Sequence, residues 1–262
     1  MALAFDLISD LHVETWPTDI DWQIMPTSPV CVVAGDVARD RDVLCDTLGR
    51  LGQSYQAVFY IDGNDEHKQY ASDLDASYQD LADRIKQIPH VVYLQDNVVV
   101  IDGVAILGTN GWWGFDFDLG IDARACGEWY KDTYAVDNSV IKHIARMSSL
   151  DAQYMINSVR RLQTLPDVEH VVLVTHTVPS AELIRHDLRI NCDLRFNVMG
   201  NRLMRHVLDA DTERKIHTWC FGHYHGTVDR IIDGVRYVNH CRGRGDTDYG
   251  QHVYYPRRMV ID

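Results

Sequence analysis

The chain alternates between short apolar segments rich in β-branched residues and longer amphipathic segments. Ten apolar segments have the length and composition of strands that are buried on one or both faces. They are residues 3–9, 29–35, 57–63, 90–94, 97–101, 104–109, 170–175, 217–222, 227–233 and 235–241. Asp102-Gly103 and Asp233-Gly234 each separate two of these segments. A two-residue Asp-Gly spacer is typical of a β-hairpin, so the pattern predicts two hairpins within a larger set of strands.

Amphipathic segments lie between the predicted strands. Apolar residues recur at three- and four-residue spacing in 40–52, 73–88 and 150–164, and residues 197–209 favour a further helix. Ser149 has the chemistry of an N-cap for the third of these helices. Strands that alternate with helices and are followed by hairpins predict an α/β fold, with mixed sheets inside and helices outside.

Residues 110–135 interrupt this alternation. The segment is long, aromatic and contains glycines, which is typical of a functional loop or lid. Trp112 and Trp113 could stack on a nucleobase and so bind substrate. The alternative is a hydrophobic patch that packs the lid or a subunit interface. Apart from this segment the chain reads as one unit, and we expect a single domain over residues 1–262.

Composition narrows the class of protein. A hydrophobic content of 46% with 24% charged residues is ordinary for a soluble globular domain, and no segment is long and apolar enough to span a bilayer. Six scattered cysteines without a CxxC pair favour a reduced, cytoplasmic setting. The net charge of −13 disfavours a duplex nucleic acid as partner, although one local basic patch would suffice for a nucleotide.

Side chains that bind metals stand directly after five of the apolar segments. They are Asp10, His12, Asp36, Asn64, His176, His223 and His225. Ligands gather at the carboxyl ends of strands in α/β sheets, and a mixture of imidazole and carboxylate donors suits Mn, Fe, Zn or Ni better than Ca. Two such ions about 3.5–4 Å apart can act on both oxygens of a phosphoryl transfer. The alternative, polar residues satisfied by ordinary hydrogen bonds, is disfavoured because the same arrangement recurs at five strand ends.

The candidate ligands lie in motifs that resemble those of the calcineurin-like metallophosphoesterases, in order and approximate spacing, over nearly the whole chain. The motifs are Asp10-Leu-His12, Gly35-Asp36, Gly63-Asn64, His176 and Gly222-His223-Tyr224-His225. The context ISDLHVE, the hairpin NVVVIDGVAILGT and the late VNHCRG are similar to the small bacterial or phage branch related to cyclic-nucleotide phosphodiesterases. The resemblance implies a four-layer α/β/β/α sandwich of two mixed β-sheets flanked by helices.

The resemblance also implies a dinuclear metal centre, with manganese favoured. One ion would be bound by Asp10, His12 and His225, and the other by Asn64, His176 and His223, with Asp36 bridging them. The implied reaction is hydrolysis of a phosphodiester or phosphomonoester through a metal-bridging hydroxide. A cyclic nucleotide or a small nucleotide ester is the expected substrate. Two rival functions are a nuclease with the same chemistry and a weakly active or non-catalytic metal-binding protein.

One position departs from the family pattern. The residue after the metal-binding Asn is usually His, which is thought to protonate or stabilise the leaving oxygen, but here it is Asp65. Two nearby dications would push the pKa of a carboxyl group down, so Asp65 cannot donate a proton near neutral pH. His67 could reach the site and replace the acid, or it could be a solvated histidine at a helix start. If no side chain replaces the acid, either the substrates have leaving groups that need no proton or the protein turns over poorly. Asp65 could also turn the loop or hold a ligand histidine.

A late arginine is the remaining candidate. Arg242 follows the VNHC sequence and corresponds to an arginine of the resembled family, so it could bind a phosphate oxygen bidentately. The alternative is an ordinary surface arginine. The sequence leaves both interpretations open.

Overall fold

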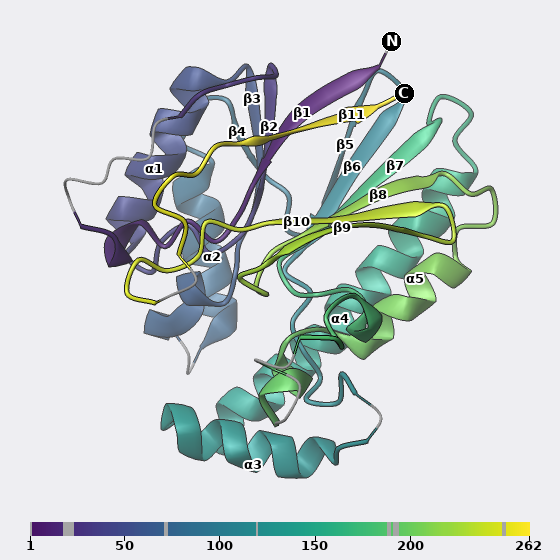
Figure 1. Cartoon of the computed structure of the whole chain (residues 1–262). Coiled ribbons are helices and arrows are strands. Elements are labelled where there is room, and N and C mark those ends of the chain that lie inside the picture. The colour runs from purple at the N-terminus through teal and green to yellow at the C-terminus, as the bar shows by residue number, and fades with distance from the viewer. Residues whose placement is uncertain are drawn as a thin grey trace.

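Two mixed β-sheets lie face to face with helices on their outer surfaces (Figure 1). The computed structural model describes residues 2–17, 24–70, 73–118, 120–187, 190, 194–247 and 250–262. The strand order is β11-β1-β2-β3-β4 in the first sheet and β5-β6-β7-β8-β10-β9 in the second. This is the four-layer α/β/β/α sandwich that the sequence predicted, so the predicted fold is confirmed.

The first sheet is parallel except at one edge. Its parallel strands are β1 (Leu3–Ile8), β2 (Val30–Ala34), β3 (Ala57–Ile61) and β4 (Val91–Tyr93). Helix α1 (Arg41–Ser54) connects β2 to β3, and α2 (Leu74–Ile85) connects β3 to β4. Strand β11 (Arg257–Ile261) pairs antiparallel with β1 and was not predicted from the sequence.

The second sheet has a parallel centre and antiparallel edges. Its strands are β5 (Asn97–Ile101), β6 (Val104–Thr109), β7 (His170–Thr175), β8 (Ile216–Phe221), β9 (Thr227–Ile232) and β10 (Val235–His240). The hairpins β5–β6 and β9–β10 turn at Asp102-Gly103 and Asp233-Gly234. Both residues of each turn have positive φ, from 48° to 89°, as a two-residue hairpin turn requires. Both predicted hairpins are confirmed.

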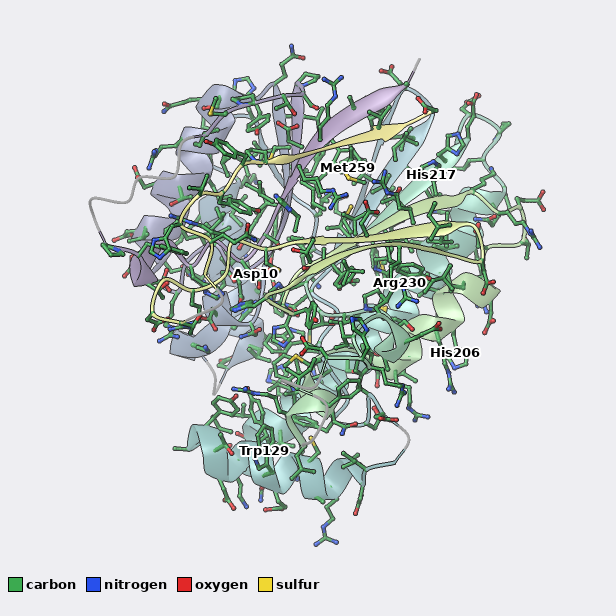
Figure 2. The ribbon with its side chains drawn as sticks, in the orientation of Figure 1. Asp10, Trp129, His206, His217, Arg230 and Met259 are labelled. Carbon is green, nitrogen blue, oxygen red and sulfur yellow. The ribbon has the colours of Figure 1, made fainter. Side chains whose placement is uncertain are left out.

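Further helices in the described residues are α3 (Ala123–Tyr134), α4 (Asn138–Gln163) and α5 (Arg205–Asp209). Short 3₁₀ helices complete the fold: η1 (Val13–Thr15), η2 (Asp65–Tyr70), η3 (Ala181–Leu183), η4 (Leu194–Val198) and η5 (Arg202–Met204). No helix in the described ranges is long and apolar enough to cross a membrane. Figure 2 shows Trp129 on α3, at the opposite end of the molecule from Met259 on β11.

The predicted helix over residues 150–164 is the second half of α4. The helix begins twelve residues earlier because Asp137 is its N-cap, and the Asp137 carboxylate accepts from Ser139 N at 2.8 Å and Val140 N at 3.2 Å. The prediction of Ser149 as the N-cap was wrong. Its hydroxyl donates to the Ala145 carbonyl at 3.3 Å inside the helix.

The interior consists of three apolar layers. One layer fills the space between the sheets, a second packs the first sheet against α1 and α2, and a third packs the second sheet against α4 and its neighbours. Central strands are therefore buried on both faces, which explains why they read as continuous apolar runs. The parallel strands end at the same edge, where Asp10 follows β1 (Figure 2).

The aromatic segment that was predicted to form a loop or lid is part of the core. Trp112, Trp113, Phe115 and Phe117 are 2–4% exposed and belong to the apolar layer around α4. The later part of the segment, residues 123–134, is α3. The lid interpretation is therefore wrong for the aromatic side chains.

Candidate metal centre

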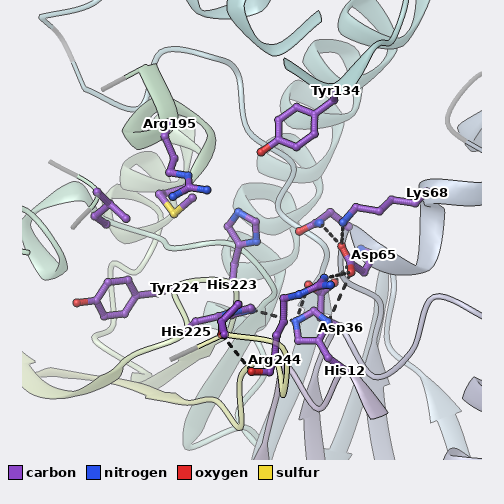
Figure 3. Close-up of a pocket in the computed structure, with 14 residues that line it drawn as sticks. His12, Asp36, Asp65, Lys68, Tyr134, Arg195, His223, Tyr224, His225 and Arg244 are labelled. Atoms are coloured by element: carbon purple, nitrogen blue, oxygen red, sulfur yellow. Dashed lines mark hydrogen bonds and ion pairs between the residues drawn. The ribbon is translucent and has the colours of Figure 1, made fainter. Parts of the chain in front are cut away.

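The loops that follow β1, β2, β3, β7 and β8 bring the predicted ligands together. Figure 3 shows His12, Asp36, His223 and His225 of this set. Donor atoms of Asp10, His12, Asp36 and His225 lie within 4.8 Å of one another. Donor atoms of a second group, Asp36, His176 and His223, meet the same criterion. Asp36 belongs to both groups, as a ligand that bridges two ions would.

In the first group, imidazole nitrogens face carboxylate oxygens. His12 Nε2 lies 2.9 Å from His225 Nε2 and 3.5 Å from Asp36 Oδ2. His225 Nε2 lies 3.2 Å from Asp10 Oδ1. Asp10 is held in turn by the backbone N–H of His223, 3.0 Å from Asp10 Oδ1, and by the Cys241 thiol, 2.9 Å from Asp10 Oδ2. Four side chains thus converge on one small volume.

In the second group, His176 faces both a carboxylate and an amide oxygen. His176 Nε2 lies 3.4 Å from Asp36 Oδ1 and 3.2 Å from Asn64 Oδ1. Asn64 was predicted as a ligand, and its amide nitrogen donates to Asp65 Oδ1 at 3.0 Å. That hydrogen bond turns the amide oxygen toward His176, which is the orientation that metal binding requires.

The ligand histidines have their outer ring nitrogens bonded to fixed acceptors. His176 Nδ1 donates to the Ala34 carbonyl at 2.9 Å, and His223 Nε2 donates to the Val198 carbonyl at 3.1 Å. Because a carbonyl can only accept, these nitrogens carry protons, and in the neutral ring the lone pair is on the other nitrogen, which faces the centre. This is the tautomer that a metal ligand needs.

The electrostatics of the centre fit a divalent cation. Burial lowers the pKa of His223 to about 3 and also lowers that of His12, so both rings are neutral near pH 7. Burial, together with the charges of Asp65 and Asp10, holds the pKa of Asp36 well above its usual range. Close buried carboxylates that repel one another, next to neutral imidazoles with inward lone pairs, form a donor set that a cation would stabilise.

Five of the seven candidate ligands have a left-handed backbone. The φ angles are 50° at Asp10, 42° at His12, 53° at Asp36, 65° at His223 and 50° at His225. This conformation costs a non-glycine residue about 1–2 kcal/mol, although Asp tolerates it better than most. Unfavourable backbone angles cluster at functional sites because the surrounding structure maintains them.

Glu66 connects the two loops that carry Asp36 and Asn64. Its buried carboxylate accepts from the backbone N–H groups of Val37 at 2.7 Å, Gly63 at 2.9 Å and Asp36 at 3.2 Å. The loops approach so closely that a Cβ on Gly63 would lie 2.1 Å from Asp36 Oδ1, so only glycine fits there. Sequence reasoning missed Glu66, although its place two residues after Asn64 was visible.

Asp65 is buried among cations. Its carboxylate lies 3.2 Å from Arg39 Nη2 and 3.3 Å from Arg244 Nη1, forms an ion pair with Lys68, and lies 3.5 Å from His12 Nδ1. Burial alone would raise its pKa, but the His12 contact and the Lys68 charge outweigh burial and hold the pKa far below the usual range. Asp65 is therefore ionised and cannot serve as a proton donor.

His67 does not reach the metal centre. It is 1% exposed, and its Nε2 lies 2.8 Å from Asp62 Oδ2 while its Nδ1 lies 2.8 Å from Ser77 Oγ. Both ring nitrogens are thus bonded within the core between η2 and α2. The predicted catalytic role and the predicted solvated position are both contradicted by this placement.

The predicted substrate contacts also lie elsewhere. Arg242 is 1% exposed and its guanidinium stacks 4.1 Å over the Trp16 ring, whereas Arg244 lines the pocket. The Trp112 indole N–H donates to the Tyr78 hydroxyl at 2.6 Å. Trp113 stacks on His223 with ring centroids 5.5 Å apart and an interplanar angle of 18°. Both tryptophans are 2% exposed, so packing, and not base stacking, is their role in this structure.

A pocket of about 370 Å³ opens over the candidate metal centre (Figure 3). Its cationic side chains are Lys68, Arg195 and Arg244, and its aromatic side chains include Tyr134 and Tyr224. The carboxylates of Asp36 and Asp65 line the same pocket, and Asp65 is paired with Lys68 and Arg244. Cations thus lie beside the metal ligands of a chain whose net charge is −13, where they can contact a small anion.

Comparison with known proteins shows that this chain is similar in fold to solved structures. No protein-family profile matches the chain, and no curated protein matches it. Among solved structures it is similar to phosphopantetheinyl hydrolase (PptH) from Mycobacterium tuberculosis, with 19% identity and a TM-score of 0.72 over 99% of this chain and 96% of that one.

Two further matching structures have TM-scores below 0.5. A putative 5′-nucleotidase from Staphylococcus aureus has 14% identity and a TM-score of 0.47 over 100% of this chain and 51% of that one. A dimetal phosphatase from Danio rerio has 13% identity and a TM-score of 0.49 over 90% and 86%. The full-length likeness to the hydrolase shows that the two chains share a fold.

Proposed function

We propose that the protein is a metal-dependent phosphoesterase that hydrolyses a phosphodiester or phosphomonoester bond of a small substrate. The observation that carries this proposal is the position of Asp36, which belongs to two converging donor groups at once. Two divalent ions bound there would supply Lewis-acid activation of water and of the phosphate oxygens. Manganese is the favoured metal, since the donors mix imidazoles with carboxylate and amide oxygens.

Asp65 acts as a positioning residue in this proposal. Its carboxylate accepts a hydrogen bond from Asn64 Nδ2 at 3.0 Å and lies 3.5 Å from His12 Nδ1. It therefore contacts one predicted ligand of each metal ion. Outer carboxylates of this kind fix the tautomer and direction of ligand histidines. The position that holds a histidine in the resembled family would therefore serve the metal ligands here.

Lys68 and Arg244 would take over the task of the missing acid. Both line the pocket, and both contact Asp65, which keeps their charges next to the metal centre. A fixed cation stabilises negative charge that develops on a leaving oxygen without transferring a proton. We therefore expect substrates with good leaving groups, such as aryl or pyrophosphate groups, to react fastest.

A small phosphorylated substrate fits the size and charge of the pocket. Nucleotide esters remain candidates, and the name of the similar hydrolase adds phosphopantetheinyl esters. A reducing compartment such as the cytoplasm is the proposed setting. The five cysteines within the described residues have free thiols, while Cys192 lies outside those residues.

The experiment that tests this function is metal removal and reloading. Protein stripped with a chelator should not hydrolyse bis-p-nitrophenyl phosphate, and Mn²⁺ should restore turnover with close to two ions bound per chain. Two bound ions without turnover of any small phosphate ester would instead favour a non-catalytic metal-binding protein. Faster cleavage of single-stranded DNA or RNA than of small esters would favour a nuclease.

A further inference from the structure

A second pocket, which we call the apolar pocket, adjoins the metal pocket. It has a volume of about 250 Å³ and lies between η2, α2, α3 and α4. Most of its lining is aliphatic or aromatic, from Leu74, Trp112, Tyr130, Val136, Val140 and Ile144, and His67 also lines it. Three helices and the aromatic segment thus surround a space that contains mostly apolar surface.

The apolar pocket and the metal pocket share part of their walls. Asn64, Lys68 and Tyr134 line both. Asn64 is a candidate metal ligand, and the Lys68 ammonium pairs with Asp65 beside the centre. A molecule whose phosphate lies at the metal centre can therefore extend past Lys68 and Tyr134 into the apolar pocket.

Hydrocarbon that enters this pocket would leave water and pack against apolar side chains, which is favourable. Tyr134 stands at the shared wall and is 45% exposed, so a ligand could enter there without disturbing the core. Ligand sites in proteins combine these same features, a mostly apolar cavity and a few polar groups at one end.

We propose that the apolar pocket binds the hydrocarbon group of a phosphate ester whose phosphate is bound at the metal centre. The substrate would then be amphiphilic, with an alkyl or aryl group next to the phosphate. This inference rests on the proposed function, because it assumes that the phosphate binds at the metals. It differs from the nucleobase stacking expected from sequence, since Trp112 contributes to an apolar wall and is not an exposed platform.

The test measures binding of n-alkylphosphonates, which are not hydrolysed, to the manganese-loaded protein by calorimetry. Affinity should rise about fourfold for each added methylene from methyl to butyl, the increment expected for burying hydrocarbon, and level off once the pocket is full. Val136 is half-buried and lines only the apolar pocket. Val136→Trp should fill that pocket and reduce the ratio of butyl to methyl affinity toward one.

Val100→Trp is the matched control, because Val100 is 49% exposed on β5 and should keep the wild-type ratio. If Val136→Trp does not fold, as judged by its melting temperature, Val136→Phe makes a smaller change of the same kind. Equal affinities for methyl- and butylphosphonate in the wild type would overturn the proposal, as would a wild-type ratio in a folded Val136 variant.

These measurements separate failure of the subsite from failure of the proposed function. Metal-dependent binding that increases with chain length, in a protein that turns over no ester, would retain the subsite and reject the enzyme. Turnover of phosphate esters without any dependence on chain length would retain the enzyme and reject the subsite.

Discussion

The two sheets contribute to one metal centre by different means. Loops after the first sheet supply Asp10, His12, Asp36 and Asn64. The carboxylates of Glu66 and Asp65 contact the last three, whereas Asp10 is held by His223 N–H and the Cys241 thiol. Loops after the second sheet supply only imidazoles. Two of those are positioned by backbone carbonyls, and the ring of His223 also packs against Trp113.

This difference bears on how each half should respond to mutation. A carboxylate that accepts several N–H groups cannot be replaced by an amide of the same shape, because the amide NH₂ would face donors. An aromatic side chain that only packs against a ligand ring can be replaced by another aromatic side chain of similar size at little cost. The first half should therefore be sensitive to isosteric changes, and the second half should tolerate conservative ones.

The largest effect is expected at the residue that both halves share. Asp36→Asn removes a carboxylate that serves both donor groups. Replacing an outer partner of a ligand typically costs 10–100-fold, so loss of this direct ligand should lower turnover by more than about 100-fold and reduce the bound metal. Metal content and hydrolysis of bis-p-nitrophenyl phosphate check this, with Asp209→Asn as a surface control. Full metal content and full activity would remove Asp36 from the centre.

Glu66→Gln is the sharpest test of the first half. We expect metal affinity to fall about 10–100-fold, since the new amide NH₂ would oppose either the backbone N–H of Val37 or those of Gly63 and Asp36. Competition with a metal chelator measures this. Glu128→Gln on the surface of α3 is the matched control. Unchanged affinity in Glu66→Gln would mean that the loops do not depend on this carboxylate.

The Asp65→His variant tests whether the metal centre lacks a proton donor at position 65 or needs a negative charge there. The new imidazole would lie among Arg39, Lys68 and Arg244 and could not anchor them. We therefore expect about a tenfold or greater loss of turnover on both bis-p-nitrophenyl phosphate and an alkyl phosphodiester. A strong gain on the alkyl ester alone would show that a proton donor is what the wild type lacks.

Trp113→Phe tests the tolerance of the second half. Phenylalanine keeps an aromatic face against His223, so we expect less than about a tenfold loss of metal affinity and a modest loss of stability. The chelator competition used for Glu66→Gln gives a direct comparison. A loss as large as that of Glu66→Gln would contradict the distinction between the two halves.

The smallest effect on the metal centre is expected from Asp151→Asn in α4. This variant should instead change how the stability of the fold depends on pH. Burial, followed by the charge of Asp96, raises the pKa of Asp151 to about 7 from an ordinary value of 3.8. The folded state thus holds a proton that the unfolded state releases, so wild-type stability falls as pH rises toward 7. The variant does not ionise. Its melting temperature relative to wild type should rise between pH 5 and pH 8, by the equivalent of about 2 kcal/mol. A pH-independent difference would contradict this.

Sequence patterns predicted those parts of the centre that local rules govern. Ligands such as Asp36 and His176 each follow a buried strand, and parallel strands of one sheet end at a common edge. The roles of Glu66 and Asp65 depend on loops that meet only after folding. No periodicity records such contacts.

Other errors came from side chains whose burial the sequence does not reveal. Trp112 and Trp113 have the composition of an exposed patch, but both belong to the buried apolar layer around α4. Strand β11 was missed because two arginines open it, while only Met259 and Ile261 face the core. A short edge strand with alternating burial has too weak a pattern to be recognised alone.

The left-handed backbone of several ligand residues should bring two kinds of laboratory selection into conflict. A library screened for heat resistance without metal should enrich glycine at positions such as 225, where the backbone conformation favours it and the side chain is 23% exposed. A library screened for metal-dependent turnover should restore histidine at the same position. Variants recovered by the first screen would then be more heat-stable but would have lost the metal centre. Selection for thermal stability would therefore have to be combined with selection for catalysis.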